Sequence, residues 1–184
     1  MRFETVTVVG GGLAGSECAL SLARRGVPVR LIEMRPKTPS PAHATDGLAE
    51  LVCSNSFKST RFESAAGLLK MELERMGSVL LSCAREAAVP AGGALAVDRE
   101  QFSRLVGERV AAEPLIELVR EEVTEIPDEP CVIAAGPLCS PALSSSIHGL
   151  VGGDSLSFFD AAAPIVDAST IDMDVLFSQS RYEE

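Results

Sequence analysis

Hydrophobic and polar positions in the first part of the chain predict a strand, a helix and a second strand. The β-branched run at residues 6–9 is typical of a buried parallel strand and leads directly into a glycine-rich stretch. Residues 13–24 place alanine and leucine at helical spacing, and Gly26 is suited to end that helix. Residues 27–32 form the next apolar run. This order is typical of a parallel sheet with flanking helices.

The middle of the chain predicts two capped helices, beyond a proline-rich loop at residues 34–45. Thr60 and Glu63 have the Thr-x-x-Glu spacing of a capping box, so a helix is expected to begin near Thr60. Asp98 and Gln101 are expected to open another helix. The expected buried faces are Leu69, Leu73, Met76 and Leu80 in the first helix, and Phe102, Leu105, Val106 and Val110 in the second.

The following part of the chain predicts several short strands. Residues 87–97 are expected to be a strand or loop of small residues, and residues 115–126 to be two short strands. Residues 131–135 form an apolar run that predicts a buried strand. Ser140 precedes a proline suited to the first position of a short helix. Alternating strands and helices indicate an α/β fold.

Two unequal parts are expected in this fold. Residues 1–150 are expected to form a Rossmann-type dinucleotide-binding domain, whose loop at residues 34–60 carries the active-site chemistry. Residues 151–184 would be the start of a further segment. Its strand-like pieces at residues 156–159 and 164–166 have no helix to cover them. The chain is therefore expected to stop within a domain.

Glycines at the first strand–helix junction have the fingerprint of a dinucleotide site. In that fingerprint Gly10 makes the tight turn, Gly12 lets the backbone approach a pyrophosphate, and Gly15 lets the helix lie close to the strand. Glu33 ends the second strand, where an acid accepts hydrogen bonds from the adenosine ribose and disfavours a 2′-phosphate, so NADP is not expected here. The expected cofactor-binding residues are Gly10, Gly11, Gly12, Leu13, Ala14, Gly15 and Glu33.

Composition and charge narrow the class of protein. The chain has 184 residues, 46% of them hydrophobic and 23% charged, which is ordinary for a folded domain. A net charge of −10 argues against a grip on nucleic acid by this segment alone. Five cysteines without a CxxC pair favour free thiols over disulfides or zinc. No apolar run is long enough to span a membrane, so a cytoplasmic protein without a metal is expected.

Cys53 is the candidate for catalysis. It lies in the polar stretch Cys53-Ser54-Asn55-Ser56, whose side chains can donate hydrogen bonds. A helix N-terminus or a flavin ring beside the thiol would lower its pKa and permit thiolate chemistry. The alternative is a loop thiol packed under the cofactor.

Other polar residues are weaker candidates. His43 and His148 are interpreted as surface or structural, and Asp46, Glu50 and Asp160 as loop carboxylates available for acid–base work. Gly136 follows the apolar run at residues 131–135. That junction either brings a second backbone segment against the cofactor or is a plain strand-ending turn.

Several longer segments resemble one known family, the bacterial folate- and FAD-dependent tRNA uracil-5 methyltransferases. The matching segments, more specific together than a glycine loop, are residues 10–17, 33–36, 49–56, 89–99, 121–127 and 160–166. Within them and beside them, Gly11 stands where the family often has alanine, and Leu48 where it usually has phenylalanine. Neither departure removes a polar or catalytic group. The family's members are more than twice as long, so the chain is expected to be the N-terminal part of such an enzyme.

The resemblance implies a glutathione-reductase-like FAD-binding fold and a defined reaction. Methylenetetrahydrofolate would give a one-carbon unit to C5 of the T-loop uridine at position 54 of tRNA, reduced FAD would supply the hydride, and NADPH or NADH would regenerate the reduced flavin. Cys53 matches the family's active-site cysteine, either as thiolate or base beside the flavin or as nucleophile on uracil C6. The tRNA would be bound mainly by regions missing from this chain.

Two alternatives stay open. The FAD-dependent enzyme that installs carboxymethylaminomethyl groups on wobble uridines has the same domain type. Its glycine loop, however, carries histidine where this chain has Leu13, and its cysteine is followed by Asn-Pro where Cys53 is followed by Ser54-Asn55. The second alternative is a dinucleotide-binding fragment without catalysis.

Overall fold

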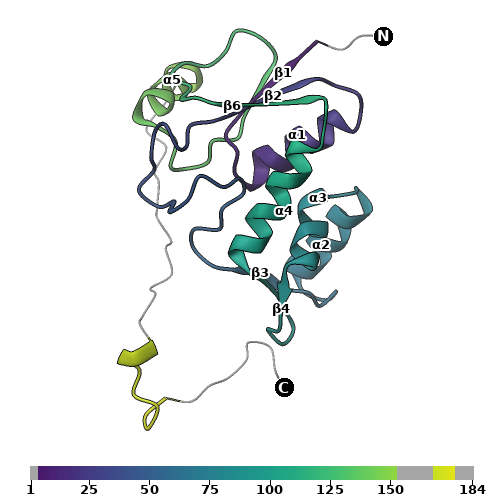
Figure 1. Cartoon of the computed structure of the whole chain (residues 1–184), viewed down its shortest axis with the longest axis vertical. Helices are drawn as coiled ribbons and strands as arrows, with labels where there is room; N and C mark the ends of the chain where they lie inside the picture. Colours follow the sequence, from purple (N-terminus) through teal and green to yellow (C-terminus); the bar gives the residue numbers. More distant parts are fainter. Residues whose placement is uncertain (1–3, 153–167, 177–184) are drawn as a thin grey trace.

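The computed structural model describes residues 4–152 and 168–176, and it contains a parallel sheet, a smaller antiparallel sheet and the helices packed between them. Figure 1 shows the parallel sheet at the top and the antiparallel strands at the bottom, with helices between. The expected α/β fold is confirmed. Strand-like pieces expected at residues 156–159 and 164–166 lie outside the described residues.

The parallel sheet has the strand order β6-β2-β1-β7. β1 (Val6–Val9) pairs with β2 (Val29–Glu33) on one side and with β7 (Cys131–Ile133) on the other, while β6 (Ile116–Arg120) pairs with β2. All these pairings are parallel. The segments that follow the four strands therefore emerge at the same edge of the sheet.

Three helices form a layer that joins the two sheets. α1 (Leu13–Ala23), α3 (Val79–Glu86) and α4 (Arg99–Ala111) contact one another, and α1 and α4 also contact β2 and β6 respectively. α5 (Pro141–Val151) lies apart from that layer in Figure 1 and begins at the predicted proline. A single 3₁₀ turn, Ala168–Thr170, is described beyond it.

The antiparallel sheet has the order β3-β5-β4. Its strands are β3 (Ser56–Ser59), β4 (Ala88–Val89) and β5 (Ala94–Val97), so residues 87–97 form a small hairpin. α2 (Ala65–Arg75) and α3 lie between β3 and β4 in the sequence, and α2 packs on β3.

The core is centred on α4. Its predicted face is confirmed, because Phe102, Leu105, Val106 and Val110 are all buried. Phe102 meets the ring of Phe57 edge to face at 5.3 Å between centroids. Burial of such side chains stabilises the fold by about 1.5–3 kcal/mol each. Asp98 Oδ1 accepts the Gln101 N–H at 2.8 Å, so the predicted cap of α4 is also confirmed.

The predicted start of the preceding helix is wrong. α2 begins at Ala65, and Ser64 is its N-cap, with Oγ accepting the Gly67 N–H at 3.1 Å. Thr60 instead donates its backbone N–H and its hydroxyl to the Gly93 carbonyl, which extends the pairing of β3 with β5. Thr60 therefore follows directly after β3 and is not a helix cap.

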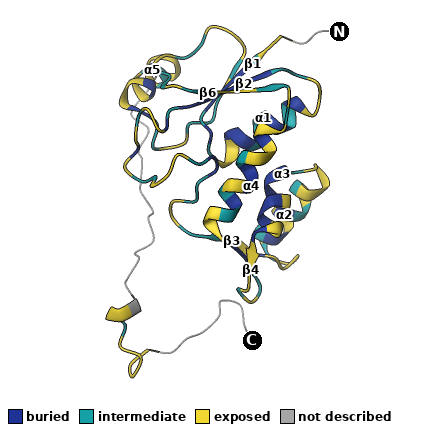
Figure 2. Cartoon of the chain, in the orientation of Figure 1, coloured by how far each residue is buried: buried dark blue, intermediate teal, exposed yellow. Residues whose placement is uncertain are grey.

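The predicted buried stripe of that helix is confirmed in part at Leu73, which is partly buried against the core, and is wrong at Leu69 and Met76. Figure 2 shows exposed as well as buried residues along α2. Leu69 is 54% and Met76 67% exposed, and the buried residues of α2 are Gly67 and Lys70. Gly67 faces the protein because a Cβ there would overlap the Arg61 carbonyl. Leu80 is buried, but it belongs to α3, which starts after a break at Gly77 with φ +80°.

Two strand predictions are also corrected. Only residues 116–120 of the expected pair of strands at residues 115–126 are extended in the sheet, as β6. The sequence predicts that β7 is buried, but its Val132 is 39% exposed. Within residues 4–152 and 168–176, β7 stands last in the strand order and has a neighbour on one side only. Among the described residues, no helix has the length and apolar character needed to cross a membrane.

Glu17 of α1 caps the neighbouring helix α3. Its carboxylate accepts hydrogen bonds from Ser78 Oγ at 2.6 Å, from the Val79 N–H at 3.0 Å and from the Leu80 N–H at 3.0 Å. These N–H groups have no partner within their own helix, and a negative charge is favourable beside them. The contact therefore fixes α1 against the start of α3.

We expect Glu17→Ala to lower the free energy of unfolding by about 1–3 kcal/mol, because it leaves the two N–H groups and the serine hydroxyl without their charged acceptor. Urea denaturation followed by circular dichroism measures the change. Glu108→Ala is the control, since Glu108 forms an exposed pair with Arg104 on α4 and should cost less than about 1 kcal/mol. Equal effects of the two substitutions would contradict the capping role.

Candidate functional site

The candidate site lies at the edge where the parallel strands end. β1 continues through α1 to β2 on one side, while β7 pairs with its other side, so the sheet has a topological switch point between β1 and β7. Ligands of open α/β sheets bind in the crevice at such a point. A pocket opens there, and its lining includes Gly10, Gly12, Glu33, His43, Glu122 and Ala135.

The glycine loop is held tightly on two sides and open on the third. Gly10 has φ +105°, and a Cβ there would come within 2.6 Å of the Ala134 carbonyl oxygen at the end of β7. A Cβ on Gly15 would overlap the Gly10 carbonyl, so α1 packs closely on the loop as the fingerprint predicts. A Cβ on Gly12 would have no atom within 4 Å. Gly12 is the N-cap of α1 and provides no side-chain hydrogen bond to the first helical turn.

Glu33 is buried at the end of β2 and faces the glycine loop. Its Oε2 accepts the Gly11 N–H at 2.8 Å. Its Oε1 accepts the backbone N–H of Arg35 at 3.0 Å and the Arg35 Nε–H at 2.8 Å. An isolated buried carboxylate would be strongly unfavourable. These three donors compensate the charge and fix its position beside the pocket.

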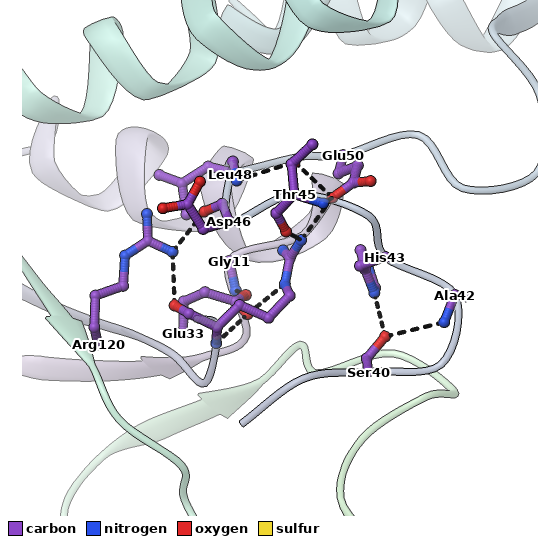
Figure 3. A network of polar contacts seen from close by, with 12 residues as sticks. Gly11, Glu33, Ser40, Ala42, His43, Thr45, Asp46, Leu48, Glu50 and Arg120 are labelled. Atoms are coloured by element: carbon purple, nitrogen blue, oxygen red, sulfur yellow. Dashed lines mark hydrogen bonds and ion pairs between the residues drawn. The ribbon is translucent and has the colours of Figure 1, made fainter. Parts of the chain in front are cut away.

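Arg35 extends this contact into a buried network, which Figure 3 shows. Its NH1 donates to Glu50 Oε2 at 2.9 Å and to the Thr45 carbonyl at 3.0 Å. The side chains of Glu33, Arg35 and Glu50 are only 6%, 4% and 14% exposed. Arg120 NH1 adds hydrogen bonds to the carbonyls of Arg35 and Asp46. The loop after β2 is therefore folded around one guanidinium group.

Both carboxylates of the network titrate at unusually low pH. Burial alone would raise the pKa of the Glu33 carboxyl, but its bonds to Arg35, the Arg35 charge and the Gly11 N–H hold it below its ordinary value of 4.5. For Glu50, burial is likewise outweighed by the N–H of Ala44, the donors of Thr45 and the Arg35 charge, and its pKa is also below 4.5. Both groups are therefore ionised at neutral pH.

His43 belongs to the pocket lining, a role that the sequence interpretation missed. Its Nδ1 lies 2.5 Å from Ser40 Oγ, and the ring is partly buried. Burial, followed by the charge of Arg35, lowers the pKa of His43 below 6.5, and the carboxylates of Glu50 and Glu33 oppose this only in part. The ring is therefore mainly neutral at pH 7. No local sequence signal marks His43 as a pocket residue, because the folding of the loop around Arg35 brings it there.

Cys53 lies outside this pocket lining and is exposed. The polar neighbours expected to surround it bond to the backbone: Ser54 Oγ accepts the Ser56 N–H at 3.1 Å, and the Asn55 amide donates to the Val97 carbonyl at 3.1 Å. They fix the strand that follows the thiol. Cys53 is therefore presented at the surface, so it is not a thiol buried under the pocket.

The weaker candidates separate in the structure. Glu50 is part of the buried network, whereas Asp46 is exposed and uses its carbonyl to accept from Arg120. His148 is exposed on α5, as the surface interpretation expects. Asp160 lies outside the described residues. The junction at Gly136, with φ +66°, follows residues that lie against Gly10, so the end of β7 packs on the glycine loop.

The two departures noted in the sequence face one another. A Cβ on Gly11 would lie 2.6 Å from a Leu48 methyl carbon and 3.0 Å from Glu33 Oε2. The Ala49 N–H donates to the Gly11 carbonyl at 2.8 Å, so the loop and the glycine turn are in close contact here. The absence of a side chain at Gly11 gives Leu48 its place.

The carboxylates of buried Glu33 and half-buried Glu50 predict a specific pH dependence of stability. Because their folded-state pKa values lie below 4.5, their contribution is fully present above the unfolded-state value and is lost as the pH falls through the folded values. We expect Glu50→Gln to cost about 1–3 kcal/mol at pH 7 and to weaken the loss of stability below pH 4.5. Urea titrations at pH 7 and pH 3.5 test this. Glu108→Gln is the exposed control, and an unchanged pH dependence in Glu50→Gln would contradict the assignment.

Sequence comparisons identify relatives of this chain among known proteins. Methylenetetrahydrofolate--tRNA-(uracil-5-)-methyltransferase TrmFO of Brevibacillus brevis is 55% identical over 184 residues, which cover 100% of this chain and 42% of that protein. The protein of the same name from Streptococcus suis is 53% identical over 180 residues, or 97% of this chain and 40% of its own length. The chain therefore spans less than half the length of these relatives.

Comparison with solved structures supports the fold. The structure of Aquifex aeolicus GidA matches with a TM-score of 0.55 at 17% sequence identity, over 70% of this chain and 21% of that one. The resemblance read from the motifs is confirmed over the whole chain by the TrmFO relatives. A family model described as glucose inhibited division protein A matches residues 5–184. The chain belongs to the glucose inhibited division protein A family.

Proposed function

We propose that this chain is the FAD-binding part of an enzyme that methylates C5 of the T-loop uridine at position 54 of tRNA, with methylenetetrahydrofolate as carbon donor. The observation that carries the proposal is the open N-terminus of α1 at Gly12. It lines the same pocket as the buried carboxylate of Glu33. The names of the relatives that match the whole chain support the substrate and the carbon donor.

The residues present fit the adenosine diphosphate half of FAD. A helix N-terminus without a side-chain cap leaves N–H groups for a pyrophosphate, and the space in front of Gly12 is free for it. Gly12, Leu13 and Ala14 would hold the phosphates. A carboxylate can accept about four hydrogen bonds, and Glu33 receives three from the protein. Its remaining capacity suits a ribose hydroxyl.

Charge at the pocket favours FAD over a 2′-phosphorylated dinucleotide. Glu33 is ionised, and Glu121 and Glu122 also line the pocket. A 2′-phosphate beside Glu33 would meet like charge, which is unfavourable. This charge argues against NADPH in the site. We propose NADPH or NADH as the reductant that regenerates the reduced flavin.

Cys53 is the proposed reactive thiol. When bound, reduced FAD supplies the hydride that converts the transferred one-carbon unit into a methyl group. The chain's own contribution is an exposed thiol within a few residues of the loop that closes on the glycine turn. Because the thiol is exposed, a uracil base of a bound tRNA could reach it. With a net charge of −10 on this chain, tRNA binding is assigned mainly to other regions of the enzyme.

The first test of the proposal is flavin binding. We expect the full-length protein, read through its natural frame, to purify with an FAD absorbance spectrum or to bind added FAD. Gly12→Ala should keep the fold, because its Cβ meets no atom, yet weaken FAD binding by placing a methyl group at the pyrophosphate position. Gly149→Ala, also in open space but on α5, is the matched control. Absence of flavin from the full-length wild type would overturn the proposal.

The second test is methylation of a T-loop uridine with methylenetetrahydrofolate and NADPH or NADH. We expect Cys53→Ala in the full-length protein to retain its FAD and lose at least about 100-fold in product formation, as expected for loss of a reacting group. Cys18→Ala controls for removal of a thiol, because Cys18 lies on α1 and does not line the dinucleotide pocket. Full activity in Cys53→Ala would remove the assigned role. NADPH oxidation without T-loop methylation, but with wobble-uridine modification, would favour the related carboxymethylaminomethyl enzyme.

A further inference from the structure

Residues 33–50 form a loop that returns to its starting point at the glycine turn. Glu33 holds the Gly11 N–H, and Ala49 donates its N–H to the Gly11 carbonyl at 2.8 Å. The N–H and the carbonyl of Gly11 are thus bonded to opposite ends of the same loop. Gly11 is therefore a hydrogen-bond partner that the two ends of the loop, Glu33 and Ala49, have in common.

Glu50 closes the loop from inside. Its carboxylate accepts the N–H of Ala44 at 2.8 Å, the N–H of Thr45 at 3.1 Å and the Thr45 hydroxyl at 2.8 Å, in addition to Arg35. Loss of one member of a buried charged network leaves the others uncompensated, so such networks hold a single arrangement. The position of Glu50 is therefore tied through Arg35 to that of Glu33.

Cys53 lies on a short crossing between two anchored points. Glu50 anchors the chain before it, and Asn55 anchors it afterwards, where the Asn55 amide donates to the Val97 carbonyl and the Asn55 carbonyl accepts the Val97 N–H at 2.9 Å. Leu51 packs against the core at the start of the crossing. Residues 51–54 therefore connect the glycine loop of the parallel sheet to β5 of the antiparallel sheet.

We infer that Glu50 is a positioning residue that links the dinucleotide site to the Cys53 segment. Through Arg35 it fixes the carboxylate that faces the ligand pocket, and through its own backbone it fixes the start of the crossing that carries the thiol. A ligand hydroxyl bonded to Glu33 would further restrain this network and so the crossing. The inference rests on the proposed function, because it takes FAD as the ligand and Cys53 as the reactive thiol.

The test compares amide hydrogen exchange of residues 51–54 in the full-length protein with and without FAD. In the wild type we expect FAD to slow exchange there by about threefold or more. In Glu50→Gln at saturating FAD this protection should be lost, and FAD should bind about three- to tenfold more weakly. Glu86→Gln is the control, because Glu86 forms an exposed pair with Arg109 on the far helices, and it should behave as wild type.

The outcomes separate this inference from the proposed function. Retained FAD-dependent protection in Glu50→Gln overturns the inference, since a residue needed only for folding would change stability and leave that response intact. Arg35→Lys, which keeps the charge and loses the planar fork, should give the same loss if Glu50→Gln folds poorly. If the wild type binds no FAD, the proposed function fails. In that case faster exchange of residues 51–54 in ligand-free Glu50→Gln still supports the positioning role, and unchanged exchange overturns it.

Discussion

The buried carboxylate of Glu33 is the constraint on which the site depends. At 5% exposure it cannot rely on water, so the protein must supply its hydrogen bonds. The Gly11 N–H and two donors of Arg35 do so. Arg35 is itself buried and needs acceptors, which Glu50 and the Thr45 carbonyl provide. The buried charge of Glu33 thereby determines how residues 33–50 fold back from the end of β2 onto the glycine turn.

Elements with local signals could be predicted from the sequence. Gly10 requires a positive φ and has no room for a side chain, so its identity marks the turn directly. Asp98 and Pro141 mark helix starts through bonds and backbone angles within one turn. The order β1, α1, β2 follows from these signals and from apolar periodicity. The position of Glu33 at the end of β2 was predictable for the same reason.

Features set by distant partners could not be predicted. Thr60 and Ser64 both satisfy the sequence rules for an N-cap, and the choice between them is made by Gly93, which accepts from Thr60 across the antiparallel sheet. His43 enters the pocket because the loop is folded around Arg35, whose partner Glu50 is distant in sequence. Apolar periodicity likewise could not reveal that α2 packs through Gly67 and leaves Leu68 and Leu69 exposed.

The helical layer explains how an exposed thiol can still have a defined position. Glu17 fixes α1 to α3, and Phe102 packs α4 against the ring of Phe57 in β3, so the two sheets are held on a common core. The two anchors of the Cys53 crossing are bonded to Arg35, just after β2, and to Val97 of β5, so each is tied to one of the two sheets. Ordering a free loop costs about 1–2 kcal/mol per residue in conformational entropy. The bonds of Glu50 and Asn55 at the two ends of residues 51–54 offset part of that cost during folding, so Cys53 is exposed and yet held between two fixed points.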